Sequence, residues 1–484
     1  MTGTVNGNLN LLHKVKKTIE DARLEKYDYE EYKAKHALTK DEIKAQREHV
    51  FPYEPMISII TQIKKEDVIN LRHTMDSVLS QTYRNIELCV ADGSMDDEAS
   101  NVIASYMREY SYVRYVRTKS SNMPGANINE ALDMSHGAYV IYLRCGDELE
   151  RNAIYEYVKV INKKARIDII YADQDEFLKH GYRTVNPVFK PNFNMDLLRT
   201  NNYIDAGVLV RRSLAIRAGR YDENLAKYYE YDYLLRCVEG TSYIGHISKM
   251  LCHVYNEKKE PDIEEEMMVL KKHFLRTGVI ATIKPLENPG YYSINYHMDN
   301  TPHVTIVIND NADDYKLKRC IESIRSKTIY RSYDILVRKF GAKLSSEQIE
   351  GDYVISMDSD YVVLSHNFIE RLMERMSQGD VSVVCSKIVD KNKRILHAGI
   401  KFTKNGAKYL FRNMPSWQYG YGMRSMLQQN VDAFPVQGII MKKEDYLMMD
   451  FENLTDEIDL NCCKTLACRD GLFSYEPNVL FQKL

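Results

Sequence analysis

Two carboxylates spaced one residue apart follow an apolar run in the second half of the sequence. The segment Gly351–Tyr361, GDYVISMDSDY, places Asp358 and Asp360 directly after a predicted buried strand. Alternate residues past a strand end can point the same way, and carboxylate oxygens are ligands that Mg²⁺ and Mn²⁺ prefer. Mg²⁺ held by one or two carboxylates commonly takes its other ligands from substrate phosphates. The spacing therefore predicts a site for a divalent cation and a phosphorylated ligand.

A near-copy of this segment occurs earlier, at Gly137–Glu148, GAYVIYLRCGDE. Arg144 and Gly146 stand where the second copy has its two acids, and Asp147 follows them. One carboxylate can hold Mg²⁺ together with a diphosphate, although weakly. Alternatively, the guanidinium of Arg144 pairs with the diphosphate directly, because its geometry matches phosphate oxygens. A third interpretation is that the first copy is inactive.

The elements that must position these residues alternate between strands and helices. Such alternation predicts a parallel sheet covered on both faces, with ligands bound beyond the carboxyl ends of the strands. Asp92, Gly93 and Ser94 lie at one such end, and the turn at Arg144–Glu148 lies at another. The predicted strands are Met56–Thr61, Ile86–Ala91, Val113–Arg117 and Ala138–Leu143, and the predicted helices are Val68–Leu79, Ser100–Tyr110 and Ala126–Met134.

The pattern recurs after residue 302, which predicts a duplicated domain rather than a solenoid. The offset between the copies falls from 246 residues at Ser77 and Ser323 to 214 at Gly137 and Gly351, so the second copy lacks 32 residues. The missing part includes any counterpart of Asp92–Ser94. We predict an N-terminal helical extension over residues 1–50, a first domain over 51–256, a connector with a helix and a small β-segment over 257–302, and a truncated second domain over 303–484.

Composition sets limits on the class of protein. The 484 residues are 44% hydrophobic and 28% charged with a net charge of −2, which does not suggest a nucleic-acid partner. No apolar run reaches the length of a membrane span, and the first residues lack the apolar core of a signal peptide. We expect cytoplasmic residence, with peripheral contact at the inner face of the membrane left open. The nine cysteines include no CxxC pair, which favours reduced thiols over zinc ligands.

The runs ISIIT, SVLSQTY, IELCVADGS, GAYVIYL and YADQDE resemble the inverting glycosyltransferases of family 2, which have a GT-A fold. Phe189–Pro191, Leu396–Gly399 and Asp456–Asp459 are similar to tandem two-domain members from rhamnan or O-antigen clusters. The resemblance implies an α/β fold with two GT-A-like, Rossmann-type mixed-sheet domains in tandem. It also implies transfer of a sugar from a nucleotide-diphosphate donor of the UDP or dTDP type. The acceptor would be a glycan, a lipid-linked glycan or a glycoprotein in cell-surface glycan synthesis.

The family's donor and metal residues can be placed on the first copy. Thr61 stands where the first strand meets the nucleotide, and Asp92, Gly93 and Ser94 match the loop that binds base and ribose. A carboxylate can accept hydrogen bonds from a pyrimidine N–H and from ribose hydroxyls. Arg144 and Asp147 stand where the family binds donor and metal, and His253 matches a histidine that approaches the metal or diphosphate. The implied cofactor is Mg²⁺ or Mn²⁺.

The family's catalytic base falls within Tyr229–Asp232. Glu230 occupies the usual position of an aspartate that takes the proton from the acceptor hydroxyl. Asp232 is the second catalytic candidate, or alternatively an acid favoured by the helix dipole. The second copy keeps the metal candidates Asp358 and Asp360 and has Glu457 and Asp459 in the base region. It has Gln482 where the resemblance implies a histidine.

Two further functions fit this degenerate pattern. One is an inactive pseudo-glycosyltransferase that serves another glycosyltransferase as scaffold or acceptor-recognition subunit. The other is a carbohydrate-binding module that kept the cleft without the chemistry. Donor hydrolysis indicates the enzyme, a stable complex with another transferase indicates the pseudo-enzyme, and glycan binding without nucleotide affinity indicates the binding module.

Overall fold

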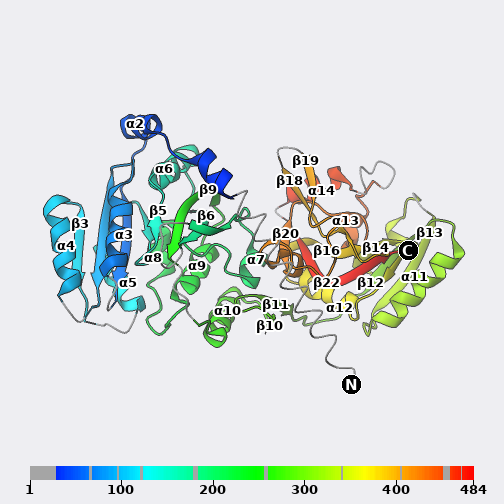
Figure 1. The fold of residues 1–484 in the computed structure, drawn as a ribbon. Coiled ribbons are helices and arrows are strands. Elements are labelled where there is room, and N and C mark those ends of the chain that lie inside the picture. The colour runs from blue at the N-terminus through cyan, green and yellow to red at the C-terminus, as the bar shows by residue number, and fades with distance from the viewer. Residues whose placement is uncertain are drawn as a thin grey trace, which may run out of the picture. The chain divides into compact units, whose positions relative to one another are not determined.

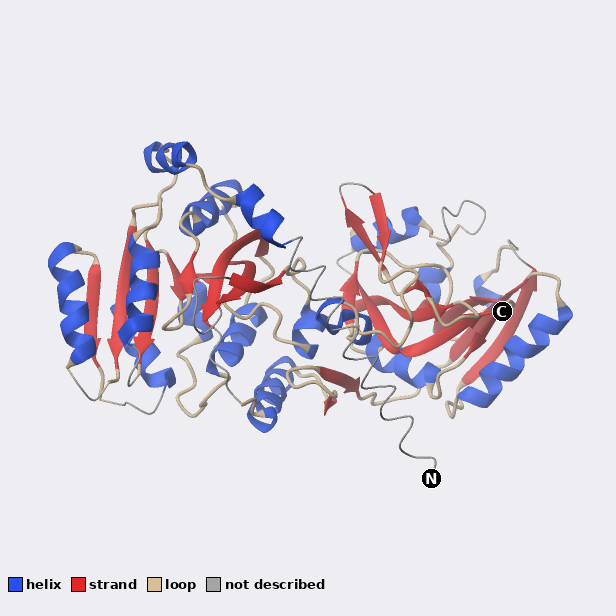
Figure 2. Ribbon diagram, in the orientation of Figure 1, coloured by secondary structure: helices blue, strands red, loops and turns tan. Residues whose placement is uncertain are grey.

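The computed structural model describes residues 29–64, 68–94, 97–119, 124–177, 184–255, 260–339, 342–403, 406–450, 458–469 and 471–484. The chain divides into two compact units, the first made of Met1–Phe193 and Tyr203–Glu265 and the second of Asn194–Asn202 and Glu266–Leu484. Each unit contains a large mixed sheet with helices packed against it (Figures 1 and 2). The predicted fold class, α/β with two sheet-bearing regions and a helical N-terminal extension, is confirmed. The part of that extension before residue 29 lies outside the described residues.

The sheet of the first unit has the strand order β3-β2-β1-β4-β8-β6-β9-β5, with β7 paired to β6. β1 pairs in parallel with β2 and β4, as the alternation predicted. β8 runs antiparallel to β4 and β6, which makes the sheet mixed. The strands are β1 (Ile57–Ile63), β2 (Ile86–Asp92), β3 (Val113–Arg117), β4 (Tyr139–Tyr142), β5 (Glu148–Leu149), β6 (Ile169–Phe177), β7 (Thr184–Val188), β8 (Leu209–Arg211) and β9 (Ile244–Tyr255).

Helices pack on this sheet through apolar residues at helical spacing. In α3, Leu71, Met75 and Val78 are fully buried, which gives the helix one apolar face. β1 is buried along its whole length, as expected for a central strand covered on both faces. The helices of this unit are α2 (Lys40–Glu48), α3 (Val68–Leu79), α4 (Glu98–Glu109), α5 (Pro124–Met134), α6 (Ala153–Lys163), α8 (Arg212–Ala218) and α9 (Tyr229–Glu239), and residues 29–36 are also helical.

The sheet of the second unit has the order β13-β12-β14-β21-β16-β22-β15, with β17 on β16 and β20 on β22. Two small hairpins, β10-β11 and β18-β19, accompany it. Its strands are β10 (Ala281–Pro285), β11 (Tyr292–Tyr296), β12 (Val304–Asp310), β13 (Tyr333–Lys339), β14 (Tyr353–Asp358), β15 (Tyr361–Val363), β16 (Val381–Val389), β17 (Ile395–His397), β18 (Ile400–Thr403), β19 (Gly406–Tyr409), β20 (Gln429–Val431), β21 (Ile439–Lys442) and β22 (Leu472–Lys483). Its helices are α7 (Met195–Thr200), α10 (Ile263–Thr277, which begins in the first unit), α11 (Asp314–Lys327), η1 (Ser346–Gln348), α12 (Phe368–Met376), η2 (Tyr421–Met426), α13 (Lys443–Tyr446) and α14 (Leu460–Ala467).

The second order repeats the first without β3, since β13, β12, β14, β21, β16, β22 and β15 take the places of β2, β1, β4, β8, β6, β9 and β5. The repeat extends to single hydrogen bonds before β4 and β14. In each unit a hydroxyl on the central strand donates to a carboxylate on the next strand and accepts from a glycine N–H. A side chain on either glycine would collide with the central-strand backbone at 2.5–2.6 Å. The groups are Ser58, Glu87 and Gly137 in the first unit and Thr305, Asp334 and Gly351 in the second.

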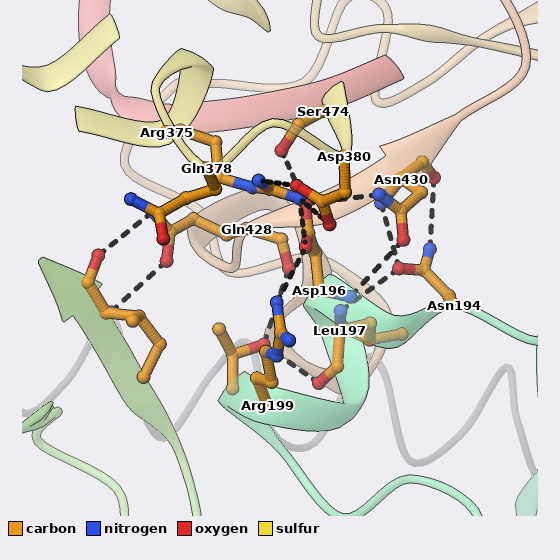
Figure 3. A network of polar contacts seen from close by, with 12 residues as sticks. Asn194, Asp196, Leu197, Arg199, Arg375, Gln378, Asp380, Gln428, Asn430 and Ser474 are labelled. Carbon is orange, nitrogen blue, oxygen red and sulfur yellow. Dashed lines mark hydrogen bonds and ion pairs between the residues drawn. The ribbon is translucent and has the colours of Figure 1, made fainter. Parts of the chain in front are cut away.

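The helix α7 belongs to the second unit although the chain on both sides of it belongs to the first. Figure 3 shows the polar network that holds it. Asp196 of α7 pairs with Arg375 of α12 at 2.9 Å, and both side chains are almost fully buried. Ser474 and Asn430 donate further hydrogen bonds to Asp196, and Arg375 also pairs with Asp380. Because every charge here has a partner, the buried network fixes α7 within the second unit.

Candidate functional site

Asp92 lies at the carboxyl end of β2 in the first unit and is fully buried. Its Oδ1 accepts hydrogen bonds from the N–H of Ser94 at 2.8 Å and from its hydroxyl at 2.5 Å. Its Oδ2 accepts from the hydroxyl of Tyr115 on β3 at 2.8 Å. Gly93 has no room for a side chain, because a Cβ there would lie 2.5 Å from the Nδ2 of Asn127. The loop predicted to bind a nucleotide is therefore held in one conformation by β3 and α5.

Four buried polar atoms around the ends of these strands have no hydrogen-bond partner among the described residues. They are Thr61 Oγ1, Gln62 Oε1, Asn127 Nδ2 and Asp147 Oδ2. Buried polar groups in native proteins nearly always have a partner, and leaving one unmade costs about 1–3 kcal/mol. The hydroxyl of Thr61 and the amide of Asn127 can donate, and the oxygens of Gln62 and Asp147 can accept. All four are thus left without partners near the edge at which α/β sheets bind ligands.

Asp147 is placed by a turn that requires glycine before it. Gly146 has φ +100°, and a Cβ at this position would lie 2.9 Å from the Cβ of Tyr255. Asp147 Oδ1 accepts from the N–H of Tyr255 at 2.8 Å. Burial raises the pKa of Asp147 to about 7, against the lowering effect of Arg144. Its second oxygen is therefore a buried acceptor that a cation or a hydrogen-bond donor would satisfy.

Arg144 holds two carboxylates in this structure. Its Nε lies 2.9 Å from each oxygen of Glu230, at the start of α9, and its Nη2 pairs with Asp205. Burial raises the pKa of Asp205, but the charge and hydrogen bond of Arg144, together with the hydrogen bond of Gln174 and the charge of Lys190, lower that pKa below its ordinary value. Both carboxylates thus contact one guanidinium. The guanidinium predicted for the diphosphate instead orients the predicted base.

Three residues missed in the sequence continue this network. Gln174 donates to Asp205 at 2.8 Å, and Lys190 donates to Gln174 at 2.7 Å. Burial lowers the pKa of Lys190 to about 8. The sequence contained a signal for Lys190, because Phe189–Pro191 resembles the tandem family members. It contained none for Asp205, whose partner Arg144 is 61 positions away in the chain. A cavity of about 40 Å³ beside Asp205 and Glu230 has space for water but not for a sugar.

Asp232 and His253 face other partners. Asp232 accepts from the Nε of Arg236 at 2.9 Å, one turn along α9. His253 has Asp175 Oδ1 at 2.5 Å from Nδ1 and Glu150 Oε2 at 3.3 Å from Nε2. Burial alone would lower the pKa of His253, but these hydrogen bonds outweigh it and raise the pKa to about 10. With both ring nitrogens on carboxylates, His253 would have to leave them before it could bind a metal.

The second unit keeps the acid pair at the end of β14. Asp358 accepts from the Nδ2 of Asn309 at 2.7 Å, and Asp360 is followed by β15. Asp360 Oδ1 is buried without a hydrogen-bond partner in the described part of the chain. β13 ends in Lys339, which pairs with Asp310 as Asp92 pairs with Ile63. The sequence predicted that the second copy lacks the nucleotide loop. In the structure Lys339 stands at the position of Asp92, and the described residues of the second unit include no counterpart of β3.

Two other predicted site residues of the second unit, Asp459 and Gln482, can be placed by their hydrogen bonds and strand pairing. Asp459 caps α14 by accepting from the N–H of Cys462 at 2.9 Å, and Glu457 lies outside the described residues. Gln482 takes the place of His253, since it pairs with Val362 of β15 as His253 pairs with Glu148 of β5. Within the described ranges, the one cluster of three metal-capable groups is His303, Asp334 and Glu350. It includes none of the predicted ligands.

Comparison with known proteins identifies the first domain. Residues 58–218 match the family model described as "Glycosyl transferase family 2". The chain therefore contains a glycosyltransferase family 2 domain, as the resemblance implied. Among the residues described by the structure, no helix is both long and apolar enough to cross a membrane.

Two curated relatives are similar over most of this chain. An uncharacterized protein, y4gI of Sinorhizobium fredii, is 27% identical over 81% of this chain and 48% of its own length. The O-antigen biosynthesis protein RfbC of Myxococcus xanthus is 23% identical over 76% of this chain and 32% of its own length. The chain thus spans about half of one relative and a third of the other. A solved structure of S. aureus TarS 1-349 in complex with UDP-GlcNAc is 15% identical, covers 46% of this chain and 66% of that chain, and has a TM-score of 0.39.

Proposed function

We propose that this chain is an inverting glycosyltransferase whose first unit moves a sugar from a nucleotide-diphosphate donor of the UDP or dTDP type. The acceptor is a hydroxyl of a glycan, a lipid-linked glycan or a glycoprotein. The observation that carries the proposal is the set of unpartnered buried atoms of Thr61, Gln62, Asn127 and Asp147. Thr61 and Gln62 lie at the carboxyl end of β1, Asp147 follows β4, and Asn127 lies on α5 next to Gly93; all four are inside the segment that matches glycosyltransferase family 2. The relative named for O-antigen biosynthesis supports the substrate class.

Donor binding follows from the groups at these strand ends. Asp92 is fixed by Ser94 and Tyr115, and its carboxylate retains acceptor capacity for a pyrimidine N–H or a ribose hydroxyl. Thr61 and Asn127 would bind ribose or phosphate oxygens with the hydrogen-bonding atoms that lack partners. Such pre-positioned groups cost little reorganisation when the donor binds.

Mg²⁺ or Mn²⁺ fits this site through one protein ligand. Asp147 Oδ2 is buried and unpartnered, so it would hold the cation together with the donor diphosphate. The bound cation would neutralise charge on the leaving nucleoside diphosphate. Arg144 lies near enough to Asp147 to lower its pKa and places a second positive charge beside the same position.

The transfer step would use Glu230 as base. Arg144 binds both oxygens of Glu230, which fixes the direction of that carboxylate. In the reaction, Glu230 takes the proton of the acceptor hydroxyl while that oxygen bonds to the anomeric carbon. The bond from this carbon to the phosphate oxygen breaks, the configuration inverts, and the nucleoside diphosphate leaves. A positioned base of this kind contributes about 10²–10⁴-fold to a rate.

The test is calorimetric titration of UDP and dTDP, with and without Mn²⁺, into the protein and into Asp92→Ala. We expect binding that Asp92→Ala weakens by about tenfold to a hundredfold and that Mn²⁺ strengthens. Binding that does not depend on Mn²⁺ would exclude the proposed role of the cation and would still support the donor site. No binding of either nucleotide under any condition would contradict the proposal.

A second candidate function is an inactive pseudo-glycosyltransferase that partners another glycosyltransferase. The observation in its favour is that the first base candidate, Glu230, has both oxygens on the Nε of Arg144, and that the second, Asp232, is paired with Arg236. This function predicts no release of nucleoside diphosphate from any donor sugar. It also predicts recovery of a stable complex with a second transferase.

A further inference from the structure

A cleft of about 870 Å³ lies in the first unit, away from Asp92 and β2. Its walls come from the helical residues 29–36, α2, β5, the start of α6 and β9. This volume lies within the range of about 300–1,000 Å³ that ligand sites occupy. The donor site described above uses none of these walls except the strand that follows Asp147.

Aromatic rings provide flat faces on the cleft wall. Tyr32 stacks on His36 with ring centroids 4.1 Å apart and meets Phe189 edge-on at 5.4 Å. Tyr155 packs against Phe51 at 5.0 Å. Tyr32 and Tyr155 are both only partly buried and both line the cleft. Their neighbours fix the ring planes, so each offers a rigid apolar face with a polar hydroxyl at its edge.

An unsatisfied amide also faces this cleft. Asn152 is 6% exposed and lines the cleft, and its Oδ1 has no hydrogen-bond partner among the described residues. It stands at the N-cap position of α6, but its side chain makes no capping hydrogen bond. A buried amide oxygen without a partner costs free energy. A ligand that donates a hydrogen bond, such as a hydroxyl, would satisfy it.

The charges of the cleft nearly cancel. Five carboxylates and five lysine or arginine side chains line it, together with two histidines, of which His253, with its pKa raised to about 10, adds one positive charge at neutral pH. Several of these groups already pair within the wall, such as Lys249 with Glu156 at 2.8 Å. A polyanion would require an excess of positive charge. A neutral ligand with many hydroxyls suits this surface, because carboxylates accept and ammonium groups donate hydrogen bonds to hydroxyls.

The cleft begins where the donor site ends. Glu148 follows Asp147 directly and lines the cleft, and it pairs across β5 and β9 with His253, which also lines it. Tyr255, two residues beyond His253, donates its N–H to Asp147. The cleft wall therefore includes the chain neighbour of Asp147, although Asp147 itself is not among the lining residues.

We propose that this cleft binds the acceptor as a neutral saccharide chain. Sugar rings pack their C–H faces on Tyr32 and Tyr155, and one hydroxyl donates to Asn152. That the bound saccharide is the acceptor rests on the proposed function, whereas saccharide binding itself does not. The same cleft would serve a binding protein without transfer activity.

The experiment is direct binding of the full chain to an array of neutral oligosaccharides, with heparin and single-stranded DNA as polyanion comparators. Affinity for the best neutral ligand is then measured by calorimetry. The variants are Tyr32→Ala and Asn152→Leu, and the matched control is Tyr243→Ala, an exposed tyrosine of the same unit outside the cleft. We expect wild-type binding to a neutral oligosaccharide, a loss of tenfold or more in both cleft variants, and a change below twofold in the control.

Three results would overturn the proposal: no neutral oligosaccharide binds, a polyanion binds better, or the cleft variants bind as wild type does. Circular dichroism and unfolding temperature confirm that each variant is folded. UDP titration on the same proteins separates this proposal from the proposed function. Nucleotide binding without saccharide binding would contradict only the proposed saccharide cleft. Saccharide binding without nucleotide binding would contradict only the proposed donor site.

Discussion

At the end of the strand that follows the repeated glycine, the first unit has Arg144 and Gly146 and the second has Asp358 and Asp360. The difference is one of backbone as well as of side chain. Gly146 has φ +100° against Tyr255, whereas Asp360 is absent from the residues with positive φ. Because an aspartate at Gly146 would be strained and would collide, the first unit cannot regain the acid pair by substitution alone.

The opposite holds at the neighbouring strand. β2 ends in Asp92 and is supported by Tyr115 of β3, whereas β13 ends in Lys339 and has no outer strand beside it among the described residues. The first unit has thus kept the pocket proposed for the nucleotide, and the second has kept the pair proposed for the metal. The same strand order is thus compatible with either half of a site, because the functional residues lie at the strand ends whereas the fold depends on the core of the sheet.

A third difference concerns the wall beside the strand ends. His253 lies between Asp175 and Glu150 in the first unit. In the second unit Gln482 pairs with Val389 across the same strands, and no carboxylate replaces Asp175. The charged triad exists only in the unit to which we assign donor and acceptor.

The largest expected effect is on transfer by the first unit. Glu230→Gln removes the proposed base, so we expect the rate of transfer to fall about 10²–10⁴-fold with UDP affinity retained. A control change in the second unit is Asp459→Asn, at the position that answers to Asp232; it alters a helix cap and should leave the rate within twofold. Radiolabelled sugar transfer measures both. Transfer that survives in Glu230→Gln would exclude this residue as the base.

The next effect is on the stability of the second unit alone. Arg375→Ala removes the nearest cationic partner of the buried Asp196 and leaves Arg199 at 4.0 Å, and breaking such a buried pair costs about 3–5 kcal/mol. We expect calorimetry to show an unfolding transition of the second unit at lower temperature, with that of the first unchanged. Arg371→Ala, on the same helix but less buried, is the control. A shift of equal size in both variants would show that the ion pair is not the cause.

The nucleotide site offers a reciprocal test. Asp92→Ala should weaken UDP binding by about tenfold to a hundredfold, since each hydrogen bond to a charged group contributes about 1.5–3 kcal/mol. Lys339→Asp places the acid at the matching strand end of the second unit. We expect it to create no UDP site, because no counterpart of Tyr115 supports it. Two bound UDP molecules per Lys339→Asp chain would mean that β3 is dispensable.

The smallest effect depends on pH. The pKa of His253 in the folded chain is about 10, above the value of about 6.5 in an unfolded chain. The charged triad therefore adds stability that is fully present below pH 6.5 and is lost as pH rises towards 10. Glu148, Asp175 and Glu150 all face this ring. His253→Gln, which copies Gln482, should cost of the order of 1–3 kcal/mol at pH 6 and little at pH 10. Unfolding curves at both pH values measure this, and a constant difference would exclude the triad as its source.

The sequence by itself determined the features that depend on local pattern and spacing. Apolar runs ending in acids located Asp92, Asp358 and Asp360 at strand ends, and the recurrence of the same segments in the same order identified the duplication. The α/β class followed from the alternation of strands and helices. These features need only the period of each element and the rule that parallel strands end at one edge.

The tertiary structure alone decided which charges meet. Arg144 and Glu230 are 86 positions apart, and Asp196 and Arg375 are 179 apart. A side chain's periodicity predicts its face but not its partner on a distant element. Whether Arg144 binds a diphosphate or a carboxylate, and whether α7 packs in the first or the second unit, depends on burial. Inside the protein an unpaired charge is costly, so the packed chain pairs each one with whatever the fold brings near.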